Sequence, residues 1–290
     1  MSGIALGLVL TAAFLHATWN YLTKRSQVKL VFVWWFLLIS GILYFPMFLY
    51  FWNQIIITKV GWTCITATSI LHAFYFGFLG MAYEVGDLSV VYPLARGMGP
   101  FLVPFFAIGL IKEQLSLPGI IGIGLIILGV YVLHLTSFSR KMVLLPFLML
   151  KSRSSLWALG TGGTIVFYSL VDKIGVSNVY PPVYVYLMFV GAFILLSPYV
   201  LMKKRGLLFE EWRKNRPAIL AVGFLALFTY LLVLFAMQMS QISYIVALRE
   251  SGILFSALYG TLWLRESHGL HKIIGAVLIF FGVFSIGLSQ

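Results

Sequence analysis

Ten long apolar runs, separated by short polar connectors, make up almost the whole chain. Each run is 18 to 24 residues long, and a helix needs about 20 apolar residues to cross the hydrocarbon core of a bilayer. Strands of a membrane barrel would be shorter and would alternate polar with apolar residues, which these runs do not. The pattern therefore predicts an all-α integral membrane protein with ten transmembrane helices. The runs fall at residues 3–23, 30–52, 61–83, 88–111, 117–135, 155–172, 183–202, 217–239, 242–264 and 269–288.

The composition agrees with this prediction and leaves no room for a separate soluble domain. Hydrophobic residues make up 61% of the chain and charged residues only 10%, whereas soluble domains carry about 25% charged residues. The net charge of +12 does not indicate nucleic-acid binding, because the lysines and arginines lie between the apolar runs. The single cysteine, Cys64, excludes an intramolecular disulfide and a cysteine-based metal cluster. The first run is too long for a signal peptide, so we expect it to be a retained helix of a multi-pass cell-membrane protein.

The two halves of the chain are copies of each other. Residues 96–130 align without a gap with residues 249–283, at an offset of 153, and eleven of the 35 positions are identical. Chance matches between apolar helices are mostly Leu on Leu, but these matches include two charged pairs and three glycine pairs. We therefore predict two five-helix repeats, residues 1–139 and 155–290, joined by a basic connector at 140–154. The charged and glycine pairs are Arg96/Arg249, Glu113/Glu266, Gly99/Gly252, Gly122/Gly275 and Gly129/Gly282.

An odd number of spans in each repeat decides how the two repeats are oriented. A repeat of five spans ends on the opposite side of the membrane from where it began, so the second repeat enters with the opposite orientation. Inverted repeats related by an axis in the membrane plane are an architecture of secondary transporters, with the binding site at the repeat interface near the midplane. The sequence therefore predicts two inverted repeats around a central cavity.

The duplicated residues also resemble a known family. The stretch YPLARGMGP at 92–100, followed by Lys112-Glu113 and the glycines of 122–129, is similar to the repeat of EamA-type proteins of the drug/metabolite transporter superfamily, and so is its second copy at 247–283. The run HATWN at 16–20 resembles a first-helix pattern of some members. The second copy departs from the first where Val246 and Ile253 replace prolines. The resemblance implies a ten-helix transporter whose helices 1, 3, 4, 6, 8 and 9 line a cavity, with 5 and 10 outside, in a family that exports amino acids, drugs and other metabolites.

The distribution of basic residues predicts the orientation of the chain. The connectors that follow the odd-numbered runs carry 15 Lys and Arg residues when Lys272, in the first turn of the last run, is counted with them, and the connectors on the other side carry 3. Basic loops stay in the cytoplasm, so both termini are predicted to be extracytoplasmic. Ten-helix relatives are usually drawn with both termini inside, and the charge count disagrees with that picture.

Arg96 and Arg249 are the most informative candidates for a site. A charge near the centre of a spanning helix costs about 3 kcal/mol on insertion scales, so such residues face the protein interior. Arg96 lies about 12 Å and Arg249 about 10 Å from the start of its run at 1.5 Å per residue, and the two enter from opposite faces. Each can pair with an anionic group of a substrate, or be tied to carbonyls or an acid as a structural clamp. Glu250 is a structural ion-pair partner or a proton carrier, and protons are a candidate coupling ion.

Further candidates for the cavity are polar or aromatic residues within the runs. An aromatic-lined cavity suits amphipathic or cationic metabolites, although each ring taken alone can equally pack against lipid or a neighbouring helix. Glu113 and Glu266 are attributed to capping of the following helix and to local ion pairs, and His268 with His271 is not expected to hold a metal. The additional substrate-binding candidates are His16, Trp19, Asn20, His72, Tyr83, Tyr92, Tyr168 and Tyr230.

These observations favour a secondary transporter that exports a small, amino-acid-like, amphipathic or drug-like metabolite by alternating access. No Walker motif is present, so the chain does not hydrolyse ATP itself. A flippase for a lipid-linked group, which the same superfamily contains, is the alternative within transport. An intramembrane enzyme would need convergent acids, a histidine cluster or a nucleophile with its base, and two arginines with one glutamate do not supply them. No cofactor is expected, and the substrate, the direction of transport and proton coupling are not determined by the sequence.

Overall fold

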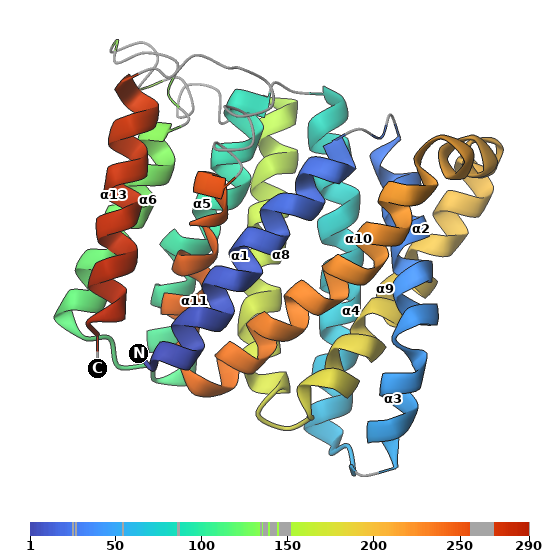
Figure 1. Ribbon diagram of the computed structural model, residues 1–290, viewed down its shortest axis with the longest axis horizontal. Coiled ribbons are helices and arrows are strands. Elements are labelled where there is room, and N and C mark those ends of the chain that lie inside the picture. Colours follow the sequence, from blue (N-terminus) through green and yellow to red (C-terminus); the bar gives the residue numbers. More distant parts are fainter. Residues whose placement is uncertain are drawn as a thin grey trace.

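The architecture was obtained from a computed structural model, shown in Figure 1. The structure describes residues 1–24, 26, 28–53, 55–85, 88–133, 135, 139, 144, 152–255 and 270–289, and the side chains of all of these except residues 24, 80, 82–94 and 153–154. Every regular element in this part of the chain is a helix. The all-α prediction is therefore confirmed for the described residues.

The helices follow the predicted apolar runs closely. Five of them are long and apolar enough to cross a membrane on their own, namely α1, α4, α9, α10 and α13, and a sixth span is formed if α2 and α3 count as one. In chain order the elements are α1 (Gly3–Lys24), α2 (Lys29–Leu43), α3 (Phe45–Trp52), α4 (Lys59–Val85), α5 (Leu88–Phe106), the π-helical turn η1 (Ala107–Ile111), α6 (Leu117–Leu133), α8 (Arg153–Gly175), α9 (Pro181–Lys203), α10 (Arg205–Met239), α11 (Ile242–Arg249) and α13 (Leu270–Gly287).

Three of the predicted runs have a different form in the structure. The run at 30–52 is bent by 48° between α2 and α3, because Pro46 in the first turn of α3 has no N–H to donate to the preceding turn. Helix α10 begins at Arg205, ahead of the predicted start at 217, because the charged segment that precedes the apolar run is helical too. Helix α11 ends at Arg249, within the predicted run at 242–264.

Helices α6 and α13 form a tightly packed pair at one side of the molecule (Figure 1). A Cβ atom placed on Gly122 would lie 2.7 Å from the carbonyl oxygen of Gly282, and one on Gly129 would lie 2.8 Å from the carbonyl oxygen of Gly275. The residue numbers rise along one helix as they fall along the other, so the two helices are antiparallel. The glycines allow the backbones to approach more closely than any side chain would permit, as in other membrane helix pairs.

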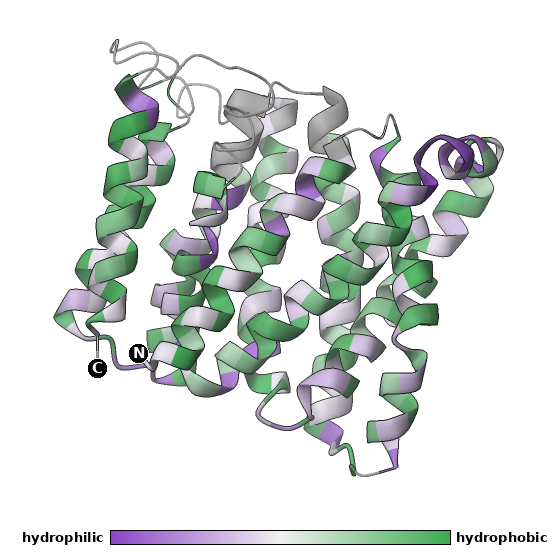
Figure 2. Cartoon of the chain, viewed as in Figure 1, coloured by the Kyte–Doolittle hydropathy of each residue, from purple (hydrophilic) through white to green (hydrophobic). Residues whose placement is uncertain are grey.

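Polar residues are concentrated at the two ends of the helices (Figure 2). The upper end of α10 in that view is strongly hydrophilic and contains an exposed ion pair between Glu210 and Lys214 at 2.7 Å. The N- and C-termini lie together at the lower edge (Figure 1). Between the two edges, α4 packs on α8 and α1 packs on α10, and the candidate site lies among these helices.

Candidate functional site

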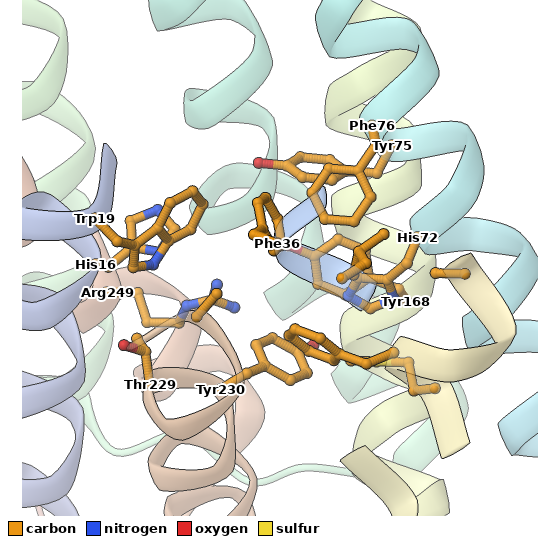
Figure 3. A pocket seen from close by; sticks show the side chains of 15 residues that line it. His16, Trp19, Phe36, His72, Tyr75, Phe76, Tyr168, Thr229, Tyr230 and Arg249 are labelled. Carbon is orange, nitrogen blue, oxygen red and sulfur yellow. The ribbon is translucent and has the colours of Figure 1, made fainter. Parts of the chain in front are cut away.

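A cavity with mainly aromatic walls lies between helices of both halves of the chain. Its volume is about 50 Å³, which leaves room for a few water molecules. Fifteen side chains from α1, α2, α4, α8, α9, α10 and α11 line it (Figure 3). Seven of these are Phe, Tyr or Trp, and the polar ones include two histidines and one arginine. The lining residues are His16, Trp19, Phe36, Leu37, His72, Tyr75, Phe76, Tyr168, Met188, Phe189, Ala192, Ala226, Thr229, Tyr230 and Arg249.

One wall of the cavity is a cluster of three rings. His72 stacks on Tyr168 with the ring centroids 4.3 Å apart, and it meets Tyr230 edge to face at 5.4 Å. The Nδ1 atom of His72 lies 2.9 Å from the carbonyl oxygen of Thr68 and 3.1 Å from its hydroxyl. These contacts fix the orientation of the imidazole, because the hydrogen bond at one ring nitrogen determines which way the other one points.

Arg249 brings a positive charge into this aromatic space. Its Cζ atom lies 5.5 Å from the centroid of the Tyr230 ring, which is within the range of a cation–π interaction. Figure 3 shows the side chain reaching from one side toward the middle of the cavity, above Tyr230. A guanidinium presents five N–H donors in a planar fork that matches a carboxylate or phosphate. The arrangement can therefore orient a ligand that has an anionic group and an apolar or aromatic body.

The first repeat fixes the start of the helix that carries Arg249. The carboxylate of Glu113 accepts hydrogen bonds from the backbone N–H groups of Ile242 and Ser243, at 2.5 and 3.3 Å, and from the Ser243 hydroxyl at 2.7 Å. These N–H groups belong to the first turn of α11, where the backbone N–H groups have no acceptor within their own helix. The prediction that Glu113 caps the helix that follows it was wrong, because its side chain turns to the other half of the chain. Glu266 lies outside the described residues.

Helix α11 ends at Arg249, the residue whose side chain lines the cavity. The next backbone hydrogen bonds run from each residue to the third residue before it, from Glu250 to Ala247 and from Ser251 to Leu248, both at 3.0 Å. This tighter turn replaces the α-helical pattern where the sequence predicted an uninterrupted span. Such a short stretch within a helix often marks a functional hinge.

Arg96 does not line the cavity but lies behind His16, which does. Its Nη2 atom donates to the Nε2 atom of His16 at 2.7 Å, and its Nη1 atom lies 3.6 Å from the Oε1 atom of Glu250. A guanidinium only donates, so His16 accepts at Nε2 and a neutral imidazole carries its proton on Nδ1. The His16 ring also packs edge to face on Trp19 at 4.6 Å. Arg96 thus supports the cavity wall from behind.

Asp172 is a buried carboxylate that no motif or repeat position in the sequence marks as part of a site. Its side chain is 0% exposed. One oxygen accepts a hydrogen bond from the Tyr184 hydroxyl at 2.8 Å, and the other accepts from the hydroxyl of Tyr230. Tyr230 lines the cavity, so the carboxylate is one side chain away from the ligand space. The residue ends an apolar run, where an acid is easily read as part of a solvated connector, and only its position within the run could have indicated burial.

The structure brings together six of the predicted site residues and separates others from them. His16, Trp19, His72, Tyr168, Tyr230 and Arg249 line one cavity. Arg96 and Glu250 form an ion pair beside it. Asn20 is half-buried and is not part of the lining, since it lies one residue beyond Trp19 and faces another direction. The side chains of Tyr83 and Tyr92 lie outside those that the structure describes.

Not all of the helices that the family resemblance implies contribute to the lining. It includes Phe36 from α2 and Phe189 from α9, whereas no described side chain of α5 takes part. Helices α6 and α13, which correspond to the two outer helices of that expectation, contribute none of the described lining residues either.

Comparisons with known proteins agree with a duplicated membrane chain. The model of the EamA-like transporter family matches residues 3–135 and again residues 152–288. No curated protein matches the chain. A solved structure titled "Crystal structure of protein" is similar with a TM-score of 0.70 at 16% sequence identity, over 97% of this chain and 94% of that one. At that identity the similarity shows a shared fold only.

Proposed function

Because the chain belongs to the EamA-like transporter family, we propose that it is a secondary transporter that exports a small metabolite by alternating access. The observation that carries this proposal is the aromatic cavity between helices of both halves, with the guanidinium of Arg249 inside it. A few polar groups in an otherwise apolar cavity are typical of small-molecule sites. The cavity lies among helices long and apolar enough to cross a membrane, where a bound solute would be held within the bilayer.

The transport model includes ten spans arranged as two inverted repeats. The antiparallel contacts of Gly122 with Gly282 and of Gly129 with Gly275 support it. In the repeat, Gly275 is equivalent to Gly122 and Gly282 is equivalent to Gly129, so the two contacts are repeat equivalents of each other. A rotation that exchanges α6 with α13 and reverses their direction reproduces both contacts. Inverted repeats allow the cavity to open alternately to the two sides by rocking of one bundle against the other.

Both termini are proposed to be extracytoplasmic. The support is the 15 to 3 distribution of Lys and Arg between the two sets of connectors, combined with the preference of basic loops for the cytoplasm. A reporter that is active only in the cytoplasm, fused to the C-terminus, should be inactive. Activity of that reporter would reverse the orientation and leave the fold unchanged.

The proposed substrate has an apolar or aromatic body and one anionic group. Aromatic rings cover most of the cavity wall, and Arg249 is the cation that lines it among the described residues. Buried charges are costly unless they are paired, so a ligand that neutralises the guanidinium would be held more strongly than one that repels it.

Three probes that share a phenyl ring test this proposal. Phenylacetate carries only a carboxylate, phenylalanine carries a carboxylate and an ammonium, and phenethylamine carries only an ammonium. We expect binding to the purified protein in lipid nanodiscs to follow that order, with at least about tenfold between the first and the last, which corresponds to 1.4 kcal/mol. Transport into proteoliposomes should rank the same way.

Two outcomes would contradict the proposed function. Equal binding of all three probes would remove the role of Arg249 in recognition. Failure of all three probes, together with movement of a fluorescent lipid between leaflets in the same vesicles, would favour the alternative of a lipid-linked group. Export is tested separately, because cells that lack the protein should retain the substrate and cells that overproduce it should lose it faster.

A further inference from the structure

We propose that the first turns of α10, residues 205–216, form a binding surface for the headgroups of anionic phospholipids. This surface is separate from the cavity, and its role goes beyond the proposed transport function. Four features of the segment point to it: its two unlike faces, its direction relative to the spanning helices, the contacts that hold it, and the balance of charge on its outer face.

The segment has one face toward the protein and one face away from it. Leu208 and Glu211, three residues apart, are half-buried and buried. Arg205, Phe209 and Arg213 are exposed and follow one another at intervals of four residues, so they share one side of the helix. Phe209 is 73% exposed. An apolar ring between two arginines is typical of helices that lie at a membrane surface, where the ring enters the acyl layer and the cations stay among the headgroups.

The segment lies along the edge of the molecule rather than across the membrane. In Figure 1 the first turns of α10, at the upper right, are seen nearly end-on, while the rest of the helix runs down across the molecule. Pro217 lies inside α10 and has no N–H to donate to the carbonyl of Arg213, which bends a helix at that point. Because the spanning helices run between the upper and lower edges, the segment is parallel to the membrane surface.

Contacts with α2 hold the segment in this position. The indole N–H of Trp35 donates to the backbone carbonyl of Leu208 at 3.0 Å, and the Trp35 ring packs on Trp212 with the centroids 4.7 Å apart. Leu207 and Leu208 also pack against a buried cluster of α2 and α9. Tryptophan rings are enriched where the membrane meets water. The outer face is therefore fixed in place at the level of the headgroups.

The outer face carries an excess of positive charge. Glu211 is 4% exposed and accepts a hydrogen bond from the Nδ2 atom of Asn215 at 2.8 Å, and Glu210 pairs with Lys214. Neither acid is left to neutralise the remaining cations. A cluster of about four to eight Lys and Arg residues beside a spanning helix is typical of sites for anionic lipid headgroups. The exposed cations of this region that form no ion pair with the described residues are Lys203, Arg205, Arg213 and Arg216.

The exposed ring of Phe209 favours a lipid over a soluble anion as the ligand. A soluble phosphate would contact only the cations and would leave the ring uncovered. A phospholipid places its phosphate against the arginines and its acyl chains against the ring at the same time. In the proposed orientation this edge faces the cytoplasmic leaflet, whose surface is negatively charged.

Native mass spectrometry of the purified full chain tests the proposal, with phosphatidylglycerol as the anionic probe and phosphatidylcholine as the zwitterionic one. We expect the first phosphatidylglycerol to bind at least about tenfold more tightly than the first phosphatidylcholine. Arg205→Gln combined with Arg213→Gln should weaken phosphatidylglycerol binding about fivefold for each cation removed and leave phosphatidylcholine binding unchanged. Arg205→Lys combined with Arg213→Lys keeps both charges and should bind like the unchanged protein.

Two cations at the opposite edge provide a matched control. Lys59 begins α4 and Lys112 follows η1, both at the lower edge (Figure 1), and both side chains are exposed. Lys59→Gln combined with Lys112→Gln removes the same charge and should leave phosphatidylglycerol binding unchanged. Equal losses in the two glutamine double variants would show an effect of net charge alone and overturn the proposal. Equal binding of the two lipids by the unchanged protein would overturn it as well.

Phe209→Ala and inorganic phosphate distinguish a lipid from a soluble anion. Phe209→Ala should weaken phosphatidylglycerol binding about threefold, because the ring no longer enters the acyl layer, and millimolar phosphate should not displace the lipid. Displacement by phosphate, together with unchanged binding in Phe209→Ala, would refute a lipid surface. Every substitution is at an exposed side chain, so the melting temperatures should stay the same. No transport substrate is used, so failure of the phenyl probes leaves this result unaffected.

Discussion

Two pairs of segments are related by the duplication: helices α6 and α13, and the segments that carry Arg96 and Arg249. The contacts of the first pair follow the symmetry of the repeats, and those of the second pair do not. Along α6 and α13 the repeats are related contact for contact, since Gly122 meets Gly282 and Gly129 meets Gly275 at nearly equal separations. Around the arginines the relation is lost. Arg96 lies within α5 and pairs with His16 and Glu250, whereas Arg249 ends α11 and faces the cavity.

One substitution between the repeats accounts for much of this difference. The position equivalent to Glu250 in the first repeat is Gly97, so only one of the two arginines has an acid beside it in sequence. That acid pairs with the arginine of the other repeat and leaves Arg249 available to the cavity. Close packing preserves symmetry, because any change on one side must be matched on the other, whereas the residues around the cavity depart from it.

The largest effect is expected from filling the glycine contact. Gly122→Leu should lower the free energy of unfolding by about 3 kcal/mol, because a side chain there meets the backbone of α13. Gly124→Leu, two residues away on the same helix, is the control, since a Cβ atom at Gly124 meets nothing within 4 Å. Thermal unfolding in nanodiscs measures both. Equal melting temperatures for the two variants would contradict the packing described for α6 and α13.

A smaller effect is expected when Arg249 is replaced by lysine. Arg249→Lys should reduce transport per folded molecule about tenfold, or 1.4 kcal/mol, because the planar donor fork is lost although the charge remains. Arg96→Lys should instead lower the melting temperature before it affects the transport rate. Flux and melting temperature measured on the same purified samples distinguish the two roles. Normal flux in an Arg249→Ala protein would remove Arg249 from the site and leave His16 and Trp19 as the next candidates.

The smallest effect concerns the ion pair between the repeats. A double-mutant cycle of Arg96→Gln and Glu250→Gln should give an interaction free energy of about 1 kcal/mol, because the two side chains are buried but their closest atoms are 3.6 Å apart. The matched cycle of Arg249→Gln and Glu250→Gln should give a smaller value. An equal or larger value for Arg249 would show that the asymmetry between the arginines is wrong.

The helical fold and the duplication could be predicted from the sequence because both depend on patterns of residues along the chain. Apolar run length determines which segments can span a bilayer, and identical charged and glycine positions reveal the repeat. The bend at Pro46 could also have been anticipated, since proline disrupts the preceding turn. The cross-repeat contact of Glu113 could not, because it depends on which helix end is brought beside it by the packing of the two halves.

Some residues of the candidate site could be predicted from the sequence, and others could not. Intramembrane charge identified Arg249. Helical spacing grouped His16 with Asn20 and placed Trp19 beside them, whereas His16 and Trp19 line the cavity and Asn20 does not. The hydrogen bonds that Asp172 accepts come from Tyr184 and Tyr230, which lie on two other helices and have no sequence relation to it. The role of Arg96 was open for the same reason, since its partners lie 80 residues before it and 154 residues after it in the chain.

The glycine contacts also have a consequence for how such a chain arises. In a protein half as long, the same surface would place Gly122 of one copy against Gly129 of a second copy inserted upside down, so the ancestor would assemble as an antiparallel homodimer. Such a protein must insert in both orientations and cannot carry a strong bias of basic residues between its connectors. Fusion of the two copies releases that restriction. The 15 to 3 distribution of Lys and Arg and the single glutamate beside Arg249 are differences that only two non-identical halves can have.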